Sequence, residues 1–97
     1  MGDLVKIKKL LKNNKNRLKR EFHVKELGVF GSYVRGDQKK SSDVDVLVAF
    51  TRTPGFIDYI KMENRLSGIL KKRVDLVMKG SLKPTIGKHI MREVVYV

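Results

Sequence analysis

The chain has 97 residues. It contains 22 lysines and arginines but only 10 aspartates and glutamates, so its formal net charge is +12. Such a positive charge favours a polyanion, an acidic protein or a nucleotide as partner. It contains no cysteine, which excludes disulfides and thiolate chemistry, and no apolar run approaches the ~18 to 20 residues of a membrane span. We therefore expect one domain over residues 1–97, located in the cytoplasm and away from membranes.

The first predicted element is a basic amphipathic helix within residues 1–24. Apolar residues recur at helical spacing from Asp3 to Phe22, and Asp3 is of a residue type that caps helix N-termini. Lysines form a row beside this apolar stripe, namely Lys8, Lys12, Lys15 and Lys19. Two interpretations of the row stay open: a solvated helix face, and a docking surface for an anionic partner.

The remaining elements alternate between strands and helices. Strands are predicted at Leu27 to Phe30, Val44 to Phe50 and Arg73 to Met78, and helices at Tyr33 to Arg35, Phe56 to Lys71 and Thr85 to Glu93. In the longest of these helices, one side is predicted to carry Phe56, Tyr59, Glu63, Leu66 and Leu70. The order of elements predicts an α+β fold, or a related α/β one, with a small mixed sheet flanked by helices.

Acidic residues in two of the predicted strands are the first indication of chemistry. Side chains alternate along a strand, so Asp43 and Asp45 share one face while the valines between and after them form a core face. Asp75 stands in the last predicted strand and would join the pair if the two strands are neighbours. Like charges ~4 Å apart repel by about 4 kcal/mol at an effective dielectric near 20. A basic side chain would relieve this repulsion, but a divalent cation does so better, and oxygen ligands favour Mg²⁺ or Mn²⁺.

Gly31 and Ser32 form a second candidate feature, because they follow a predicted strand and precede a predicted helix. Glycine lets a backbone approach a ligand closely, and free N–H groups at a helix start suit phosphate oxygens, to which the Ser32 hydroxyl adds a donor. Arg35 follows three residues later, where it either reaches a phosphate or is an ordinary surface arginine. The turn and the acids are adjacent along the chain, so a nucleoside triphosphate would bridge them through metal ions.

The combined motif of Gly-Ser, ten residues and Asp-x-Asp, with an acid in a later strand, resembles the signature of the DNA polymerase β-like nucleotidyltransferase superfamily. At this length the chain resembles the minimal nucleotidyltransferase family, the antitoxin partners of HEPN-domain ribonuclease toxins. The resemblance covers roughly residues 25–97 and includes "FGSYVRG", "SSDVDVLVAF", "PGFIDYI", "KRVDLV", "LKP" and "REVVYV".

This resemblance implies a fold, a site and a reaction. The fold would be a small mixed-sheet nucleotidyltransferase core, in which Asp43 and Asp45 hold two Mg²⁺ ions. Asp75 would hold the catalytic metal and help to activate the attacking hydroxyl, and Gly31 and Ser32 would cradle the β- and γ-phosphates of ATP. The acceptor would be a tyrosine hydroxyl on the HEPN toxin, which attacks the α-phosphate, releases pyrophosphate and leaves the toxin adenylylated and silent.

A second interpretation stays open beside this one. The chain would be a basic binding module, either a nucleic-acid binder or a steric antitoxin with a relict catalytic site. It would depend on the lysine-rich first helix, but the sequence lacks the interleaved aromatic and basic residues of RNA- or DNA-binding motifs. We therefore favour the Mg²⁺-dependent enzyme, with ATP as its substrate and a toxin protein as its partner.

Overall fold

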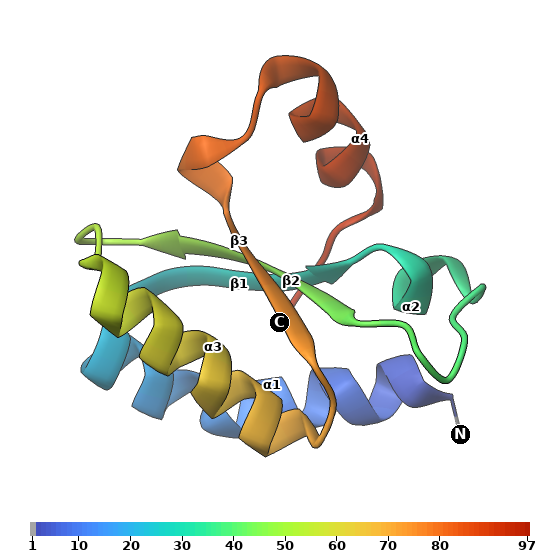
Figure 1. The fold of residues 1–97 in the computed structure, drawn as a ribbon, viewed down its shortest axis with the longest axis horizontal. Coiled ribbons are helices and arrows are strands. Elements are labelled where there is room, and N and C mark those ends of the chain that lie inside the picture. Colours follow the sequence, from blue (N-terminus) through green and yellow to red (C-terminus); the bar gives the residue numbers. More distant parts are fainter. Residues whose placement is uncertain (1) are drawn as a thin grey trace.

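A mixed four-stranded sheet lies between two layers of helices in the computed structural model, which describes residues 2–97 (Figure 1). The strands are β1 (Val24–Phe30), β2 (Val44–Phe50), β3 (Val74–Met78) and β4 (Val95–Tyr96). The helices are α1 (Asp3–Phe22), α2 (Ser32–Arg35), α3 (Phe56–Leu70) and α4 (Pro84–Glu93), with the short 3-10 helix η1 (Lys79–Ser81). The strand order is β3-β2-β1-β4, in which β2 and β3 are parallel and β1 is antiparallel to both β2 and β4. The predicted α+β fold is confirmed.

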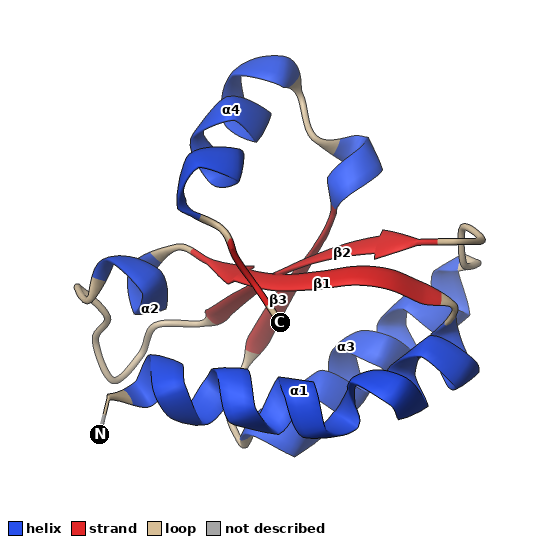
Figure 2. Ribbon diagram, turned by 180° about the vertical axis from the view of Figure 1, so that it is seen from behind, coloured by secondary structure: helices blue, strands red, loops and turns tan. Residues whose placement is uncertain are grey.

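The two faces of the sheet are covered unequally. Figures 1 and 2 show α1 and α3 beneath one face, while α4 and η1 lie over the other. The larger core lies on the face of α1 and α3, where all three valines of β2 are fully buried, as the alternation predicted. A smaller core on the α4 face joins Phe30, Leu47 and Ile90, so the acidic face of β2 also leads into packed side chains. No helix among residues 2–97 is long and apolar enough to cross a membrane.

Helix α1 buries the apolar stripe that its sequence predicts. The buried residues are Ile7, Leu11, Leu18 and Phe22. The predicted N-cap is wrong, because Gly2 rather than Asp3 is the N-cap residue, whereas the helix ends at Phe22, where the predicted apolar pattern also ends. Asp3 instead begins the first turn, where a negative charge interacts favourably with the helix dipole. The helix ends where His23 adopts the left-handed conformation, with φ 60° and ψ 37°, and donates its N–H to Lys19 O.

Three other sequence predictions differ from the structure. Strand β1 begins at Val24 rather than Leu27, because the strand continues through an irregularity in its pairing with β2 between Val24 and Glu26. Phe56, predicted on the packed side of α3, is 80% exposed. The residues that α3 buries are Met62, Leu66 and Leu70. Strand β4 was not predicted, because its two residues are too few to show an alternating pattern.

The row of lysines on α1 is only partly solvated. Lys12 and Lys19 are exposed, but Lys8 and Lys15 are half-buried. Lys15 Nζ donates a 2.6 Å hydrogen bond to the backbone oxygen of Val97, which follows β4. Lys15 therefore ties this end of the chain to α1, and its role is at least partly structural.

Side chains of α3 occupy the free edge of β3, the outermost strand beside β2. The Tyr59 hydroxyl donates a hydrogen bond to Leu76 O, and Glu63 Oε2 accepts one of 3.2 Å from Leu76 N–H. Both backbone groups of this edge residue are thereby satisfied, which blocks pairing with a further strand. The same contacts fix the backbone beside Asp75.

Candidate active site

Asp45 lies at the centre of the candidate site because β2 has a neighbouring strand on each side. It pairs with Asp75 of β3 in parallel register and with Phe30 of β1 in antiparallel register. Directly paired residues point to the same face of a sheet, so Asp45 and Asp75 share the α4 face, as the sequence led us to expect. Phe30 is followed at once by Gly31, which brings the glycine turn to the other side of Asp45.

Gly31 is the residue through which this turn approaches the carboxylates. Its φ of 83° and ψ of −152° lie in a region that is essentially restricted to glycine. A Cβ at this position would also overlap Oδ2 of Asp45. Both facts explain why the turn requires glycine, and they show that the turn and the central carboxylate are in direct contact. Ser32 follows as the first residue of α2 and is half-buried.

The carboxyl group of Asp45 is destabilised in its charged form. Partial burial, and after it the negative charges of Asp75 and Asp43, raise the pKa of Asp45 from 3.8 to about 6. Arg35 acts in the opposite direction and lowers this pKa, while Glu93 raises it. Asp75 and Asp43 are therefore each close enough to Asp45 to repel its negative charge.

Asp43 lies just before β2 and is paired with a basic side chain. Arg73 Nε is 3.1 Å from Asp43 Oδ1, but the contact lacks hydrogen-bond alignment, and this buried oxygen accepts no hydrogen bond. The side chains of Arg73 and Asp43 are 81% and 44% exposed, and such pairs contribute about 0 to 1 kcal/mol. Arg73 thus places a positive charge beside Asp43, as one of the two predicted alternatives required, while Asp43 Oδ1 accepts no hydrogen bond.

The three aspartates offer a metal ion oxygen ligands only, the donor type that Mg²⁺ and Mn²⁺ prefer. Among residues 2–97, no three Asp, Glu, His or Cys side chains stand close enough to hold a metal ion as they are arranged. Asp45 and Asp75 are in register, but Asp43 faces Arg73, so coordination by all three requires Asp43 to turn away from it. The lack of a hydrogen bond to Asp43 Oδ1 and the repulsion at Asp45 both fit a cation bound near these carboxylates.

Arg35 and Glu93 complete the site around the glycine turn. Arg35 Nη1 lies 3.1 Å and 3.2 Å from the two carboxylate oxygens of Glu93, and Arg35 Nε lies 3.3 Å from Asp37 Oδ2. Hydrogen bonds to Glu93 first, and to Asp37 second, raise the pKa of Arg35. Glu93 Oε1 also accepts a 3.0 Å hydrogen bond from Gly31 N–H. Glu93 is not among the predicted site residues, because it is 62 residues from Gly31, although it lies within the "REVVYV" segment.

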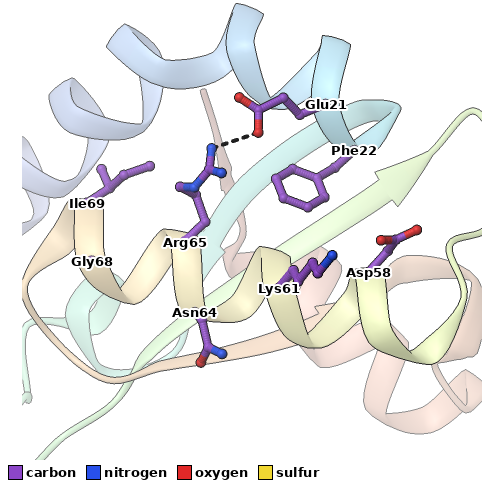
Figure 3. Close-up of a pocket in the computed structure, with 8 residues that line it drawn as sticks. All are labelled: Glu21, Phe22, Asp58, Lys61, Asn64, Arg65, Gly68 and Ile69. Atoms are coloured by element: carbon purple, nitrogen blue, oxygen red, sulfur yellow. Dashed lines mark hydrogen bonds and ion pairs between the residues drawn. The ribbon is translucent and has the colours of Figure 1, made fainter.

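A groove of about 860 Å³ lies in the layer of α1 and α3, on the other face of the sheet from Asp45 and Asp75 (Figure 1). Figure 3 shows the residues that line it. It runs between α1 and α3, and apolar Phe22 and Ile69 line it together with charged side chains. Figure 3 shows the ion pair of Arg65 with Glu21, whose charged atoms are 2.8 Å apart. None of the predicted site residues lines this groove, so it is distinct from the candidate active site.

A glycine turn against in-register carboxylates is an arrangement that suits phosphate groups together with metal ions. The chain belongs to the nucleotidyltransferase domain family, whose pattern matches residues 7–97. It is 51% identical over 97 residues to the protein adenylyltransferase MntA of Thermococcus cleftensis. This similarity covers 100% of this chain and 98% of MntA. The family expected from the motif is thereby confirmed.

Solved structures show the same fold. A minimal nucleotidyltransferase structure is similar with a TM-score of 0.79 and 28% identity, covering 98% of this chain and 95% of the other. A toxin–antitoxin structure with AMP-PNP is similar with a TM-score of 0.71 and 26% identity, covering 99% of this chain and 72% of the other. Both similarities extend over nearly all of the elements described above.

Proposed function

We propose that this chain is a protein adenylyltransferase, which transfers AMP from ATP to a tyrosine of a HEPN-domain ribonuclease toxin and so acts as that toxin's antitoxin. The observation that carries the proposal is the position of Asp45, which lies against Asp75 on one side and against Gly31 on the other. Similarity to MntA over the whole chain supports the adenylylating activity. Similarity to the toxin–antitoxin structure with AMP-PNP supports ATP and a toxin as the ligands.

The phosphate groups of ATP would bind at the glycine turn. Gly31 has no side chain and its backbone lies against Asp45 Oδ2, so a phosphate bound at this turn would lie beside the carboxylates, and the Ser32 hydroxyl adds a hydrogen-bond donor. Arg35 lies on the same short helix and supplies a positive charge with several N–H donors. These three residues would hold the β- and γ-phosphates, which orients the α-phosphate toward the carboxylates.

The acidic residues would act on the other side of the α-phosphate. Asp43, Asp45 and Asp75 would hold two Mg²⁺ ions, or Mn²⁺ in their place, which supply positive charge to the reacting phosphate when bound. Asp75 is exposed, so an acceptor protein has access to it. We assign Asp75 the role of general base that first accepts the tyrosine proton, because a carboxylate beside the attacking hydroxyl is suited to it.

The transfer would be a single displacement at the α-phosphorus. The tyrosine oxygen forms a bond to the α-phosphorus while the bond from that phosphorus to the oxygen bridging to the β-phosphate breaks. The bridging oxygen keeps the electron pair and leaves as part of pyrophosphate, and the proton of the tyrosine passes to Asp75 and on to solvent. The product is a toxin that carries AMP on its tyrosine.

A second candidate function is binding without catalysis, either to nucleic acid or to the toxin as a steric block. The observation that favours it is the exposed basic face of α1. Its exposed lysines and arginines are Lys6, Lys9, Lys12, Arg17, Lys19 and Arg20. This face belongs to the helical layer on the opposite side of the sheet from the acids, so binding there would not need the candidate active site (Figure 1).

Transfer of radiolabel from ATP labelled at the α-phosphate separates these candidates. The protein is incubated with Mg²⁺, labelled ATP and either a HEPN toxin or total RNA, and the modified residue is identified by mass spectrometry. We expect label on a toxin tyrosine with the native protein and none with Asp45→Asn. Ser32→Ala should slow transfer less than Asp45→Asn does, because one hydrogen bond to a charged group contributes about 1.5 to 3 kcal/mol.

Two outcomes would contradict the proposal. Label on RNA alone, with the toxin present and unmodified, would make the chain a nucleic-acid nucleotidyltransferase. Equal neutralisation of the toxin by the native protein and by Asp45→Asn, without label on the toxin, would favour the steric module.

A further inference from the structure

The carboxylate of Glu93 binds Gly31 and Arg35, two of the residues that would bind the phosphates of ATP in the proposed function. Its Oε1 accepts a 3.0 Å hydrogen bond from Gly31 N–H, and both of its oxygens lie within 3.2 Å of Arg35 Nη1. The Glu93 side chain is 25% exposed, so the contact is partly shielded from water. An anion is therefore already bound at the glycine turn, and it comes from the last residue of α4.

A carboxylate and a phosphate use such donors in the same way. Each presents several negatively charged oxygens, which accept hydrogen bonds from backbone N–H groups and from a guanidinium. A single N–H donates one strong hydrogen bond, so Gly31 N–H does not serve Glu93 and a phosphate oxygen fully at once. Glu93 also adds negative charge near Asp45 and so raises the pKa of that carboxyl.

We propose that Glu93 is an internal competitor of the triphosphate, which holds Gly31 N–H and Arg35 in the nucleotide-free protein and is displaced when ATP binds. The proposal rests on the proposed function, because it takes these two residues as phosphate ligands. Glu93 then controls the affinity of the nucleotide site, because it sets how tightly a triphosphate binds without contacting the reacting atoms.

The connection of Glu93 to the fold determines how it is displaced. Ile90, one turn earlier in α4, is packed into the core with Phe30 and Leu47. On the other side of Glu93, β4 is paired with β1 at Val95. The backbone on both sides of Glu93 is thus held by the sheet, so we expect the side chain to leave Gly31 by rotation while α4 stays in place.

Glu93→Gln tests the competition with little change in shape. The amide oxygen of glutamine still accepts a hydrogen bond from Gly31 N–H, but the negative charge that holds Arg35 and opposes the triphosphate is gone. We expect the Kd for ATP with Mg²⁺, measured by calorimetry, to fall about tenfold. Tripolyphosphate should bind correspondingly more tightly, because the effect concerns the phosphates and not the base. In transfer assays KM for ATP should fall with kcat nearly unchanged.

Glu26→Gln is the matched control, because it makes the same change in net charge. Glu26 pairs with Lys79 at 3.2 Å and is aligned with Ala49, four residues along β2 from Asp45. We expect the Kd for ATP to change less than twofold in this variant. Glu93→Asp provides a second test if Glu93→Gln folds poorly by circular dichroism. Its shorter side chain withdraws the carboxylate from Gly31 and should also lower the Kd.

The outcomes distinguish failure of this inference from failure of the proposed function. ATP binding that is equal in native protein and Glu93→Gln, or weaker in the variant, overturns the competition and makes Glu93 a residue that merely supports the turn. Failure of all variants and of the native protein to bind ATP with Mg²⁺ overturns the proposed function, and the inference with it. Tighter binding in Glu93→Gln and not in Glu26→Gln supports the competition.

Discussion

Replacement of Asp45 by asparagine should stabilise the metal-free protein at pH 8 while it abolishes nucleotidyl transfer. The native carboxylate is partly buried and faces two other acids, which raise its pKa to about 6. Folding therefore favours the protonated form. The stability that protonation supplies is complete below pH 3.8, the unfolded value, and is lost as the pH rises through about 6. Asparagine has a similar shape and no charge, so it does not lose this stability.

The size of the effect follows from the two pKa values. A carboxyl whose pKa rises from 3.8 to about 6 on folding costs about 3 kcal/mol of stability at neutral pH. Asp45 is only half-buried, so solvent screens part of this cost and we expect a gain of about 1 to 2 kcal/mol in Asp45→Asn. The gain should be present at pH 8 and should vanish near pH 4, where the native carboxyl is largely protonated.

Urea unfolding followed by circular dichroism, in EDTA at pH 8 and at pH 4, measures this difference. Asp58→Asn is the control, because Asp58 is exposed in the first turn of α3, and its loss should lower stability slightly through the helix dipole. A loss of stability in Asp45→Asn at pH 8, or a gain that is equal at both pH values, would refute the argument that repulsion and burial destabilise the native carboxylate.

Three further predictions follow from the site and its surroundings. Gly31→Ala should destabilise the fold more than Gly36→Ala in urea unfolding. Both glycines have positive φ, but an added Cβ overlaps a carboxylate oxygen only at Gly31 and meets nothing within 4 Å at Gly36. Equal losses of stability would contradict the close approach of Gly31 to Asp45. Tyr59→Phe should cost about 1 kcal/mol, because Leu76 O loses its hydrogen bond, and an unchanged midpoint would mean that water replaces the hydroxyl. ATP and Mg²⁺ at one hundred times Kd should stabilise the protein by about 2.7 kcal/mol in thermal unfolding, and EDTA should remove the effect; a shift that survives EDTA would contradict a metal-dependent site.

Local patterns in the sequence were sufficient for several features of the site. The alternation along residues 43–50 separates two acids from the core valines, because side chains of any strand alternate between its faces. The apolar stripe of α1 is equally local, since a helix repeats every 3.6 residues wherever it packs. The spacing of Gly-Ser and Asp-x-Asp lies within 15 residues of chain, so it indicated the family directly.

Only the tertiary structure decided which of these features meet. The position of β2 between β1 and β3 puts Asp45 beside both Gly31 and Asp75, and this register depends on hydrogen bonds between strands that no local period encodes. Glu93 reaches Gly31 across 62 residues, and Arg73 reaches Asp43 from the position just before β3. Contacts between distant segments are set by the packing of the whole chain. For that reason the side chains that contact Gly31 and Asp43 could not be predicted from the sequence.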